Sequence, residues 1–167
     1  NGKRIILTGN YGTGKSRCIQ ELFTYLSDIK DLKSSLATSI DLRSHWGTIR
    51  GTEIIRRHFD DLGLSKSADN VIKMMSKSGV ILLLDGFDEI ASQTWSDDPS
   101  RLKEIRARSL LGVKNLIQTS TGGLIITGRV HYFNTNAEMF NSLGLSDKTT
   151  VLVQCKDQFS DEEMSRY

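Results

Sequence analysis

Eight residues near the start of the chain, Gly-Asn-Tyr-Gly-Thr-Gly-Lys-Ser at positions 9–16, restrict its possible folds more than any other segment. They match the pattern G-x-x-x-x-G-K-[ST], in which a glycine-rich loop leaves the end of a strand and enters a helix. The short apolar run Arg4–Thr8 precedes the loop. The apolar positions after it recur at intervals of three and four, as on one face of a helix: Cys18, Ile19, Leu22, Phe23, Leu26 and Ile29. The segment therefore predicts a strand–loop–helix unit of an α/β domain.

Four further apolar runs predict strands. They lie at residues 36–42, 80–84, 124–127 and 150–153. The run at residues 80–84, Val-Ile-Leu-Leu-Leu, has the composition of a central parallel strand buried on both faces. Helical segments alternate with these runs, so we predict an α/β fold with a five-stranded, mostly parallel sheet.

The predicted helices lie between the strands and after the last one. Two are expected at residues 53–62 and 68–76. After a polar loop at residues 92–99, Asp98 and Pro99 predict the N-cap and first position of one long helix. That helix carries apolar residues toward the sheet: Leu102, Ile105, Val113, Leu116 and Ile117. Ser-Asp-Glu-Glu at residues 160–163 is a capping-box pattern and predicts a last helix.

The composition excludes several classes of protein. With 167 residues, 38% hydrophobic and 25% charged, the chain has the usage of a globular protein, and we expect one domain over residues 1–167. A net charge of +2 gives no indication of nucleic-acid binding. The longest unbroken apolar run has only five residues, so no membrane span is expected. The chain begins at Asn1 and not at methionine, and we expect it to be an excised piece of a larger protein.

The glycine-rich loop has the chemistry of a polyphosphate site. Gly9, Gly12 and Gly14 lack a Cβ, so the backbone can approach an anion closely with its N–H groups. Lys15 adds a cation for the β- and γ-phosphates, and Ser16 offers a hydroxyl to Mg²⁺. The remaining expected nucleotide contacts come from the other loop positions and the next residue: Asn10, Tyr11, Thr13 and Arg17. A dinucleotide fingerprint is excluded, because Arg17 stands where its third glycine or alanine would be.

Three carboxylates directly follow the central strand, in Asp85-Gly-Phe-Asp88-Glu89. Such a cluster at the end of a buried strand needs a compensating cation, and a Mg²⁺ carried by a nucleotide would supply one. We expect Asp85 to be the metal's outer ligand, together with Ser16. Glu89, or alternatively Asp88, would orient and deprotonate an attacking water. The simpler alternative is a loop of solvated acids without a function.

Arg129 follows another predicted strand, at residues 124–128. Ligands of open α/β sheets bind outside the carboxyl ends of the strands. We therefore expect the glycine-rich loop, Asp85 and Arg129 to meet at one crevice, where Arg129 would contact the γ-phosphate. The alternative is an ordinary surface arginine.

Other residues carry weaker signals. Four basic residues begin the long predicted helix and are interpreted as a solvated face, or less readily as a contact with a neighbouring subunit's nucleotide: Arg101, Lys103, Arg106 and Arg108. Trp46 is interpreted as a packing residue, with shielding of the nucleotide as the alternative. Cys18 and Cys155 are expected to be small core residues.

Two of these motifs resemble a known family. Leu-Leu-Leu-Asp-Gly-Phe-Asp-Glu at residues 82–89 is similar to the acidic motif of NACHT domains, which belong to the STAND class of signalling P-loop NTPases. Ile-Ile-Thr-Gly-Arg at residues 125–129 resembles the sensor-1 strand of that family. The family commonly has Thr-Ser-Arg-Pro there, whereas Gly128 and Val130 flank the arginine in this chain.

The resemblance implies a P-loop NTPase three-layer sandwich with the sensor strand between the two Walker strands. It implies that residues 9–16 are the Walker A loop, Asp85 the Mg²⁺-associated acid, Glu89 the hydrolytic acid and Arg129 the sensor. ATP or ADP with Mg²⁺ would be the ligand. The implied protein is a cytoplasmic homo-oligomer in innate immune or anti-phage defence. Its partners would be its own lid, sensor and effector domains, and neither a membrane nor nucleic acid.

Three functions follow from these expectations. The first is an ATPase that acts as a nucleotide-dependent conformational and oligomerisation switch; the absence of an Asn-Lys-x-Asp sequence favours ATP over GTP. The second is a scaffold module that binds nucleotide without significant turnover. The third, a small-molecule kinase, is disfavoured because no acceptor site can be read from the sequence. The family's helical and winged-helix lid is not part of these residues, so we expect the chain alone to be nearly inactive.

Overall fold

The computed structural model describes residues 2–29, 35–90 and 97–157. Its centre is one sheet of five strands, all parallel, in the order β2-β3-β4-β1-β5. The strands are β1 (Arg4–Thr8), β2 (Leu36–Asp41), β3 (Val80–Asp85), β4 (Leu124–Gly128) and β5 (Thr150–Gln154). The predicted α/β fold with a P-loop NTPase-like three-layer sandwich is confirmed. So is the placement of β4 between β1 and β3.

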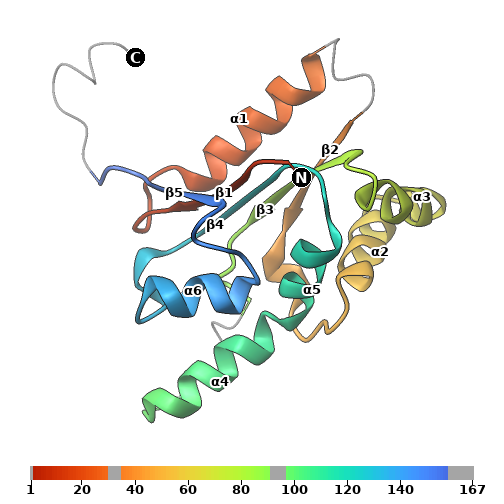
Figure 1. Cartoon of the computed structure of the whole chain (residues 1–167). Helices are drawn as coiled ribbons and strands as arrows, with labels where there is room; N and C mark the ends of the chain where they lie inside the picture. The colour runs from red at the N-terminus through yellow and green to blue at the C-terminus, as the bar shows by residue number, and fades with distance from the viewer. Residues whose placement is uncertain (1, 30–34, 91–96, 158–167) are drawn as a thin grey trace, which may run out of the picture.

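Helices cover both faces of the sheet. They are α1 (Lys15–Asp28), α2 (Gly51–Asp61), α3 (Ser65–Met75), α4 (Pro99–Ser109), α5 (Leu111–Thr119) and α6 (Asn136–Leu143), with short 3₁₀ turns η1 (Leu42–His45) and η2 (Val130–Tyr132). Figure 1 shows α1 on one face and α2, α3, α5 and α6 on the other. The strand order explains this, because the connection from β1 to β2 runs in the opposite direction along the sheet from the later ones. Right-handed crossovers then place α1 on the opposite face.

The main hydrophobic core lies between the sheet and the layer of α2, α3, α5 and α6. Inward-facing strand residues such as Ile6, Leu82 and Ile126 are fully buried there. The opposite face is covered more thinly, since Ile19 is the one buried residue of α1. Cys18 is exposed, so its prediction as a core residue was wrong; Cys155 is half-buried.

Two helix predictions needed correction. The single long helix expected after Asp98 is divided at Leu110, whose backbone leaves the helical region, into α4 and α5. The predicted cap itself is confirmed, because the Asp98 carboxylate accepts a hydrogen bond from the backbone N–H of Ser100. Helix α6 was not predicted, although Thr135 and Glu138 have capping-box spacing and Gly144 ends the helix with a positive φ of 67°.

Two expectations fall largely or wholly outside the described residues. They are the last helix at residues 160–163 and most of the polar loop at residues 92–99. Within the described ranges, no helix is both long enough and apolar enough to cross a membrane.

Candidate functional site

The glycine-rich loop leaves β1 and enters α1 as the sequence predicts. Gly12 and Gly14 have φ values of 79° and 83°, a left-handed conformation that side chains with a Cβ rarely adopt. Helix α1 begins at Lys15, so its first backbone N–H groups face the loop's interior. The Lys15 ammonium donates hydrogen bonds to the backbone carbonyls of Gly9, at 3.0 Å, and Asn10, at 2.7 Å. The lysine thus lies folded against the loop at the place where phosphates would displace those bonds.

A crevice of about 320 Å³ opens at the carboxyl edge of the sheet, beside this loop. The ends of β1, β3 and β4 all contribute to it, so the expected meeting of the three strand ends is found. The lining residues include most of the predicted site: Tyr11, Gly12, Gly14, Lys15, Ser16, Arg17, Asp85, Gly86, Asp88, Glu89, Thr127 and Arg129. Gly9, Asn10 and Thr13 shape the loop without lining the crevice. The Thr13 hydroxyl donates to the carbonyl of Asn10, and a Cβ at Gly9 would come within 2.6 Å of that hydroxyl.

Asp85 is oriented by the neighbouring strand. The Thr127 hydroxyl, fully buried on β4, donates a hydrogen bond to the Asp85 carboxylate. The same hydroxyl accepts a hydrogen bond of 3.0 Å from the backbone N–H of Gly86. Thr127 was missed as a site residue, although a lone hydroxyl near the end of an apolar strand was its signal. The bond from Gly86 holds the Thr127 hydroxyl, and that hydroxyl in turn orients the Asp85 carboxylate at the crevice.

Asp88 holds Arg129. The Asp88 carboxylate lies 2.9 Å from Nε of Arg129 and accepts a 3.2 Å hydrogen bond from the backbone N–H of Arg129. The aspartate side chain is 7% exposed and the arginine side chain 53%, so the pair is anchored at the acid. Burial raises the pKa of Asp88, and the bonds to Arg129 oppose that rise. The guanidinium also lies over the ring of Tyr11, 5.8 Å from its centroid.

Glu89 is held by a residue that sequence reasoning missed. Nε of Arg43, in η1 directly after β2, lies 2.7 Å from Oε2 of Glu89. Asp41 supports this arginine by accepting a 2.9 Å hydrogen bond from its backbone N–H. Arg43 follows the carboxyl end of β2, and that position was its signal. Thus β2, a strand at the edge of the sheet, is followed by a residue that contacts one of the carboxylates after β3.

Phe87 packs beside the end of β4 and limits which residue fits at position 128. A Cβ added at Gly128 would come within 2.3 Å of the Phe87 ring, which is fully buried. The ring packs with Tyr132 and Phe133, at centroid distances of 5.8 and 5.5 Å. A residue with a Cβ at position 128 would therefore clash with this ring.

The residues of the crevice are better suited to a Mg²⁺ ion that is bound to a nucleotide than to a metal ion that is held by protein ligands alone. Across the described ranges, no group of three or more His, Cys, Asp and Glu side chains is arranged to hold an ion. Ser16 and Asp85 bring a hydroxyl and a carboxylate to the same crevice. Mg²⁺ prefers oxygen donors, takes few of them from protein and completes its shell with phosphates and water. These two residues would hold it.

The structure corrects two minor interpretations. Arg106 is buried against Glu138 of α6, with 3.4 Å between Nη1 and Oε1, so it is not part of a solvated face. The other three basic residues of that helix are exposed, as expected: Arg101, Lys103 and Arg108. Trp46 is 57% exposed and does not line the crevice, so its side chain is neither packed away from solvent nor part of the crevice wall.

No protein-family model matches the sequence, and no curated protein matches it either. The crevice must therefore be interpreted from its own residues. Those residues combine backbone anion donors, one lysine, three carboxylates and two arginines. That set can bind a polyphosphate with its metal and can place a water beside the terminal phosphate.

Proposed function

We propose that this crevice binds ATP with Mg²⁺ and hydrolyses it, and that the chain is the nucleotide-binding core of a NACHT-like signalling ATPase. The observation that carries the proposal is the convergence of the glycine-rich loop, Asp85, Glu89 and Arg129 on one crevice. A phosphate loop alone serves many functions. The added acids and arginine supply what hydrolysis of a terminal phosphate requires.

Each residue has a role that follows from its position. Backbone N–H groups of the loop and the start of α1 bind the phosphates, and Lys15 exchanges its loop carbonyls for the β- and γ-phosphates. Ser16 and Asp85 hold Mg²⁺, which neutralises charge on the phosphate oxygens. Glu89 orients and deprotonates the attacking water. Arg129 stabilises the charge that spreads over the transferred group.

The wider assignment rests on the motif resemblance. A switch that couples nucleotide state to oligomerisation, a lid supplied by flanking segments, a defence role and a cytoplasmic location are all part of this proposal. The strand order β3-β4-β1, which the resemblance implies, supports it.

A nucleotide-binding scaffold without turnover is the second candidate. It is favoured by the ion pair that engages Arg129 with the buried carboxylate of Asp88. If this pair persists with nucleotide bound, Arg129 does not stabilise charge on the transferred group and the site only binds.

Calorimetric titration with ATP–Mg²⁺ followed by a phosphate-release assay separates the two. We expect Lys15→Ala to weaken binding at least thirtyfold, roughly the cost of losing one partner of a desolvated charge pair. We expect Glu89→Gln to bind normally and to lose about 10²–10⁴ in rate, the range for a general base. Lys66→Ala and Glu104→Gln, at exposed positions outside the crevice, are the matched controls.

The outcomes distinguish the candidates. Binding that is retained in Lys15→Ala contradicts the site itself. Equal hydrolysis by Glu89→Gln and the unmodified chain contradicts the catalytic role of Glu89. Tight binding with no phosphate release by either protein favours the scaffold.

A further inference from the structure

The segment after β5 lies along the start of the glycine-rich loop. The backbone N–H of Cys155 donates a 2.7 Å hydrogen bond to the carbonyl of Thr8, so the ladder between β1 and β5 continues one residue past β5. Two residues later, the Asp157 carboxylate accepts a 2.9 Å hydrogen bond from the side-chain amide of Asn10. We call residues 155–157 the loop-side segment. It borders the loop but does not line the crevice.

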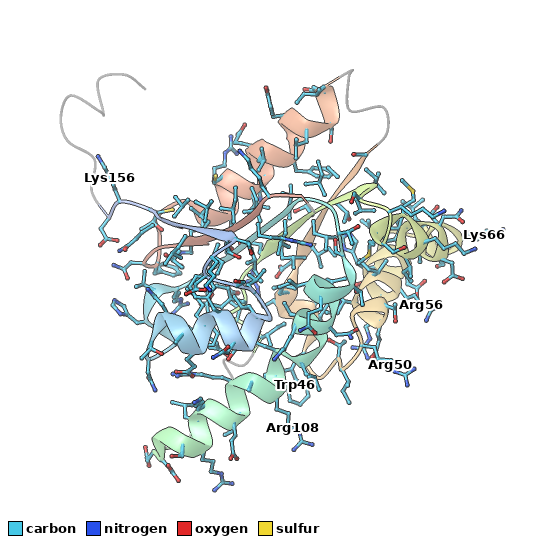
Figure 2. All side chains as sticks on the ribbon, in the orientation of Figure 1. Trp46, Arg50, Arg56, Lys66, Arg108 and Lys156 are labelled. Atoms are coloured by element: carbon cyan, nitrogen blue, oxygen red, sulfur yellow. The ribbon has the colours of Figure 1, made fainter. Side chains whose placement is uncertain are left out.

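Cys155 packs against the first residue of the loop. A Cβ added at Gly9 would come within 2.9 Å of the Cβ of Cys155. Cys155 is half-buried, whereas the next residue, Lys156, is exposed, and Figure 2 shows this lysine at the outer edge of the molecule. The Cβ from which the Cys155 thiol extends is thus fixed at the base of the loop.

The second cysteine lies at the other end of the same loop. Cys18 is in the first turn of α1, and its backbone N–H donates a 2.8 Å hydrogen bond to the carbonyl of Gly14, the last glycine of the loop. The residue is exposed to an incoming reagent. Partial burial raises the pKa of Cys18, and the like charge of Cys155 raises it further, which requires the two thiols to be close. The two cysteines are therefore neighbours in space, although they are far apart in the chain.

We infer that Cys18 and Cys155 form a reversible disulfide when the chain meets an oxidised low-molecular-weight thiol such as glutathione disulfide. They are the only two cysteines of the chain, and both are free thiols in this structure. The bond joins the first turn of α1 to the loop-side segment, and so links the two ends of the glycine-rich loop from outside the crevice. In a reducing compartment both thiols stay free until an oxidant is present, and reductants reverse the bond. Neither cysteine lines the crevice, so the inference does not depend on the proposed function.

The exposure of the two residues sets the order of the steps. The exposed Cys18 thiolate attacks one sulfur of glutathione disulfide, whose S–S bond breaks, and one glutathione leaves as a thiolate and takes up a proton. The half-buried Cys155 thiolate then attacks the Cys18 sulfur of this mixed disulfide and displaces the second glutathione in the same way. Two cysteine thiols are thereby oxidised to one disulfide, and glutathione disulfide is reduced to two glutathione thiols.

Oxidation of the folded chain in a glutathione redox buffer, followed by acid quenching and mass spectrometry, tests the inference. The folded chain should lose two hydrogens, carry no glutathione and yield one cross-linked pair of peptides that contain Cys18 and Cys155. In concentrated urea the two cysteines are no longer neighbours. The ratio of internal to mixed disulfide should then be lower by about a hundredfold or more, because a flexible chain gives a low effective concentration. Equal ratios in the folded and unfolded chain would overturn the inference.

A matched variant moves one thiol and keeps the number of cysteines. In the double variant Cys18→Ser, Ser27→Cys the thiol lies more than two helical turns further along α1, about 13 Å away, at an exposed position. This folded variant should stop at mixed disulfides with glutathione. Cys155→Ser should stop at one glutathione on Cys18. Circular dichroism checks that each variant folds. An internal disulfide that forms as readily in the double variant as in the unmodified chain would contradict the proximity of the two native cysteines.

Stability distinguishes a bond that fits the fold from one that distorts it. A disulfide that is compatible with the native geometry stabilises a protein, because it restricts the unfolded chain. The oxidised chain should therefore unfold at a higher urea concentration than the reduced chain, and dithiothreitol should reverse the shift. A midpoint that stays or falls on oxidation would show that the two cysteines are not poised for the bond, and the inference would be wrong.

Discussion

Arg129 shows how one buried partner fixes an exposed charged side chain. Its guanidinium is half exposed and would be free to move, but Asp88 binds both its Nε and its backbone N–H. The acid is nearly buried and so has little freedom itself. Tyr11 contacts the guanidinium from the loop side. The arginine is thereby held at the edge of the crevice.

Arg43 holds Glu89 through an ion pair, as Asp88 holds Arg129. If the pair between Arg43 and Glu89 positions this carboxylate, Arg43→Gln should lower the rate of ATP hydrolysis about ten- to hundredfold, the effect of small misplacement of a catalytic group. Affinity for ATP should be unchanged, because Arg43 does not line the crevice. Arg43→Lys should restore part of the rate. Single-turnover phosphate release with parallel calorimetry measures both quantities.

The control for Arg43 is Arg56→Gln, which removes an exposed pair with Asp69 away from the crevice. An equal rate for Arg43→Gln and the unmodified chain would show that Glu89 is positioned by other contacts.

Gly128 gives a prediction about stability. Gly128→Ala places a methyl group against the buried Phe87 ring and should destabilise the fold by about 1–3 kcal/mol, the usual cost of overpacking. Urea denaturation measures the loss. Adding Phe87→Leu should recover part of it, because a smaller side chain leaves room for the methyl group. A loss that is unaffected by Phe87→Leu would place the strain elsewhere.

At the scale of single elements, α4 differs from the other helices in how it is attached. It contributes no buried apolar side chain among the described residues. Its contact with α6 depends on the buried ion pair between Arg106 and Glu138, and the Arg106 guanidinium also lies 5.2 Å from the centre of the Tyr132 ring. Glu138 is occupied further by a 3.1 Å hydrogen bond from the backbone N–H of Asn134. Polar contacts thus take the place of a hydrophobic face.

Arg106→Met should destabilise the chain by about 3–5 kcal/mol, because it leaves the Glu138 carboxylate buried without its partner. The double variant Arg106→Met, Glu138→Met should lose much less, since no charge is then buried alone. Urea denaturation gives the energies, and hydrogen exchange should show that α4 loses protection first. Arg101→Met, at an exposed position of the same helix, is the control. Equal losses in the single and double variants would contradict the ion pair's role.

At the scale of the whole molecule, the parallel sheet assembles the site. All five strands run in one direction, so their carboxyl ends meet at one edge. Four of them, β1 to β4, end in or beside the crevice residues. The polar groups are thereby collected at one edge, and the buried apolar core occupies the opposite side of the sheet from α1.

The stability of the whole fold should depend on pH through two histidines. Burial lowers the pKa of His45 and His58 from the ordinary 6.5. Below that value the unfolded chain binds more protons than the folded one, so stability is complete above about pH 6.5 and falls as the pH decreases. Each additional proton contributes a slope of about 1.4 kcal/mol per pH unit. The raised pKa of Asp88 acts in the opposite direction, in the acidic range above 3.8.

Urea denaturation from pH 8 downward measures this dependence. His45→Gln should flatten it, since His45 is 1% exposed and its Nδ1 has no hydrogen-bond partner within the described residues. Exposed His131→Gln is the control. A slope that is the same in His45→Gln and the unmodified chain would contradict a buried neutral imidazole at this position.

Local signals in the sequence were sufficient for much of the architecture. The glycine-rich loop, the five strands and the Asp98 cap each depend on neighbouring residues, so their patterns could be read directly. The general rule for parallel sheets then predicted that Asp85 and Arg129 would lie near the loop. Helix α6 was also readable from Thr135 and Glu138 and was overlooked.

Tertiary structure alone decided the partners of individual side chains. The pairs Arg43–Glu89, Asp88–Arg129 and Arg106–Glu138 join residues far apart in the chain, and the contact between Phe87 and Gly128 joins two strand ends. No periodicity or spacing encodes such contacts, because they depend on how strands pair and helices pack. Sequence therefore determined which chemical groups reach the crevice edge, and packing determined how each of them is held there.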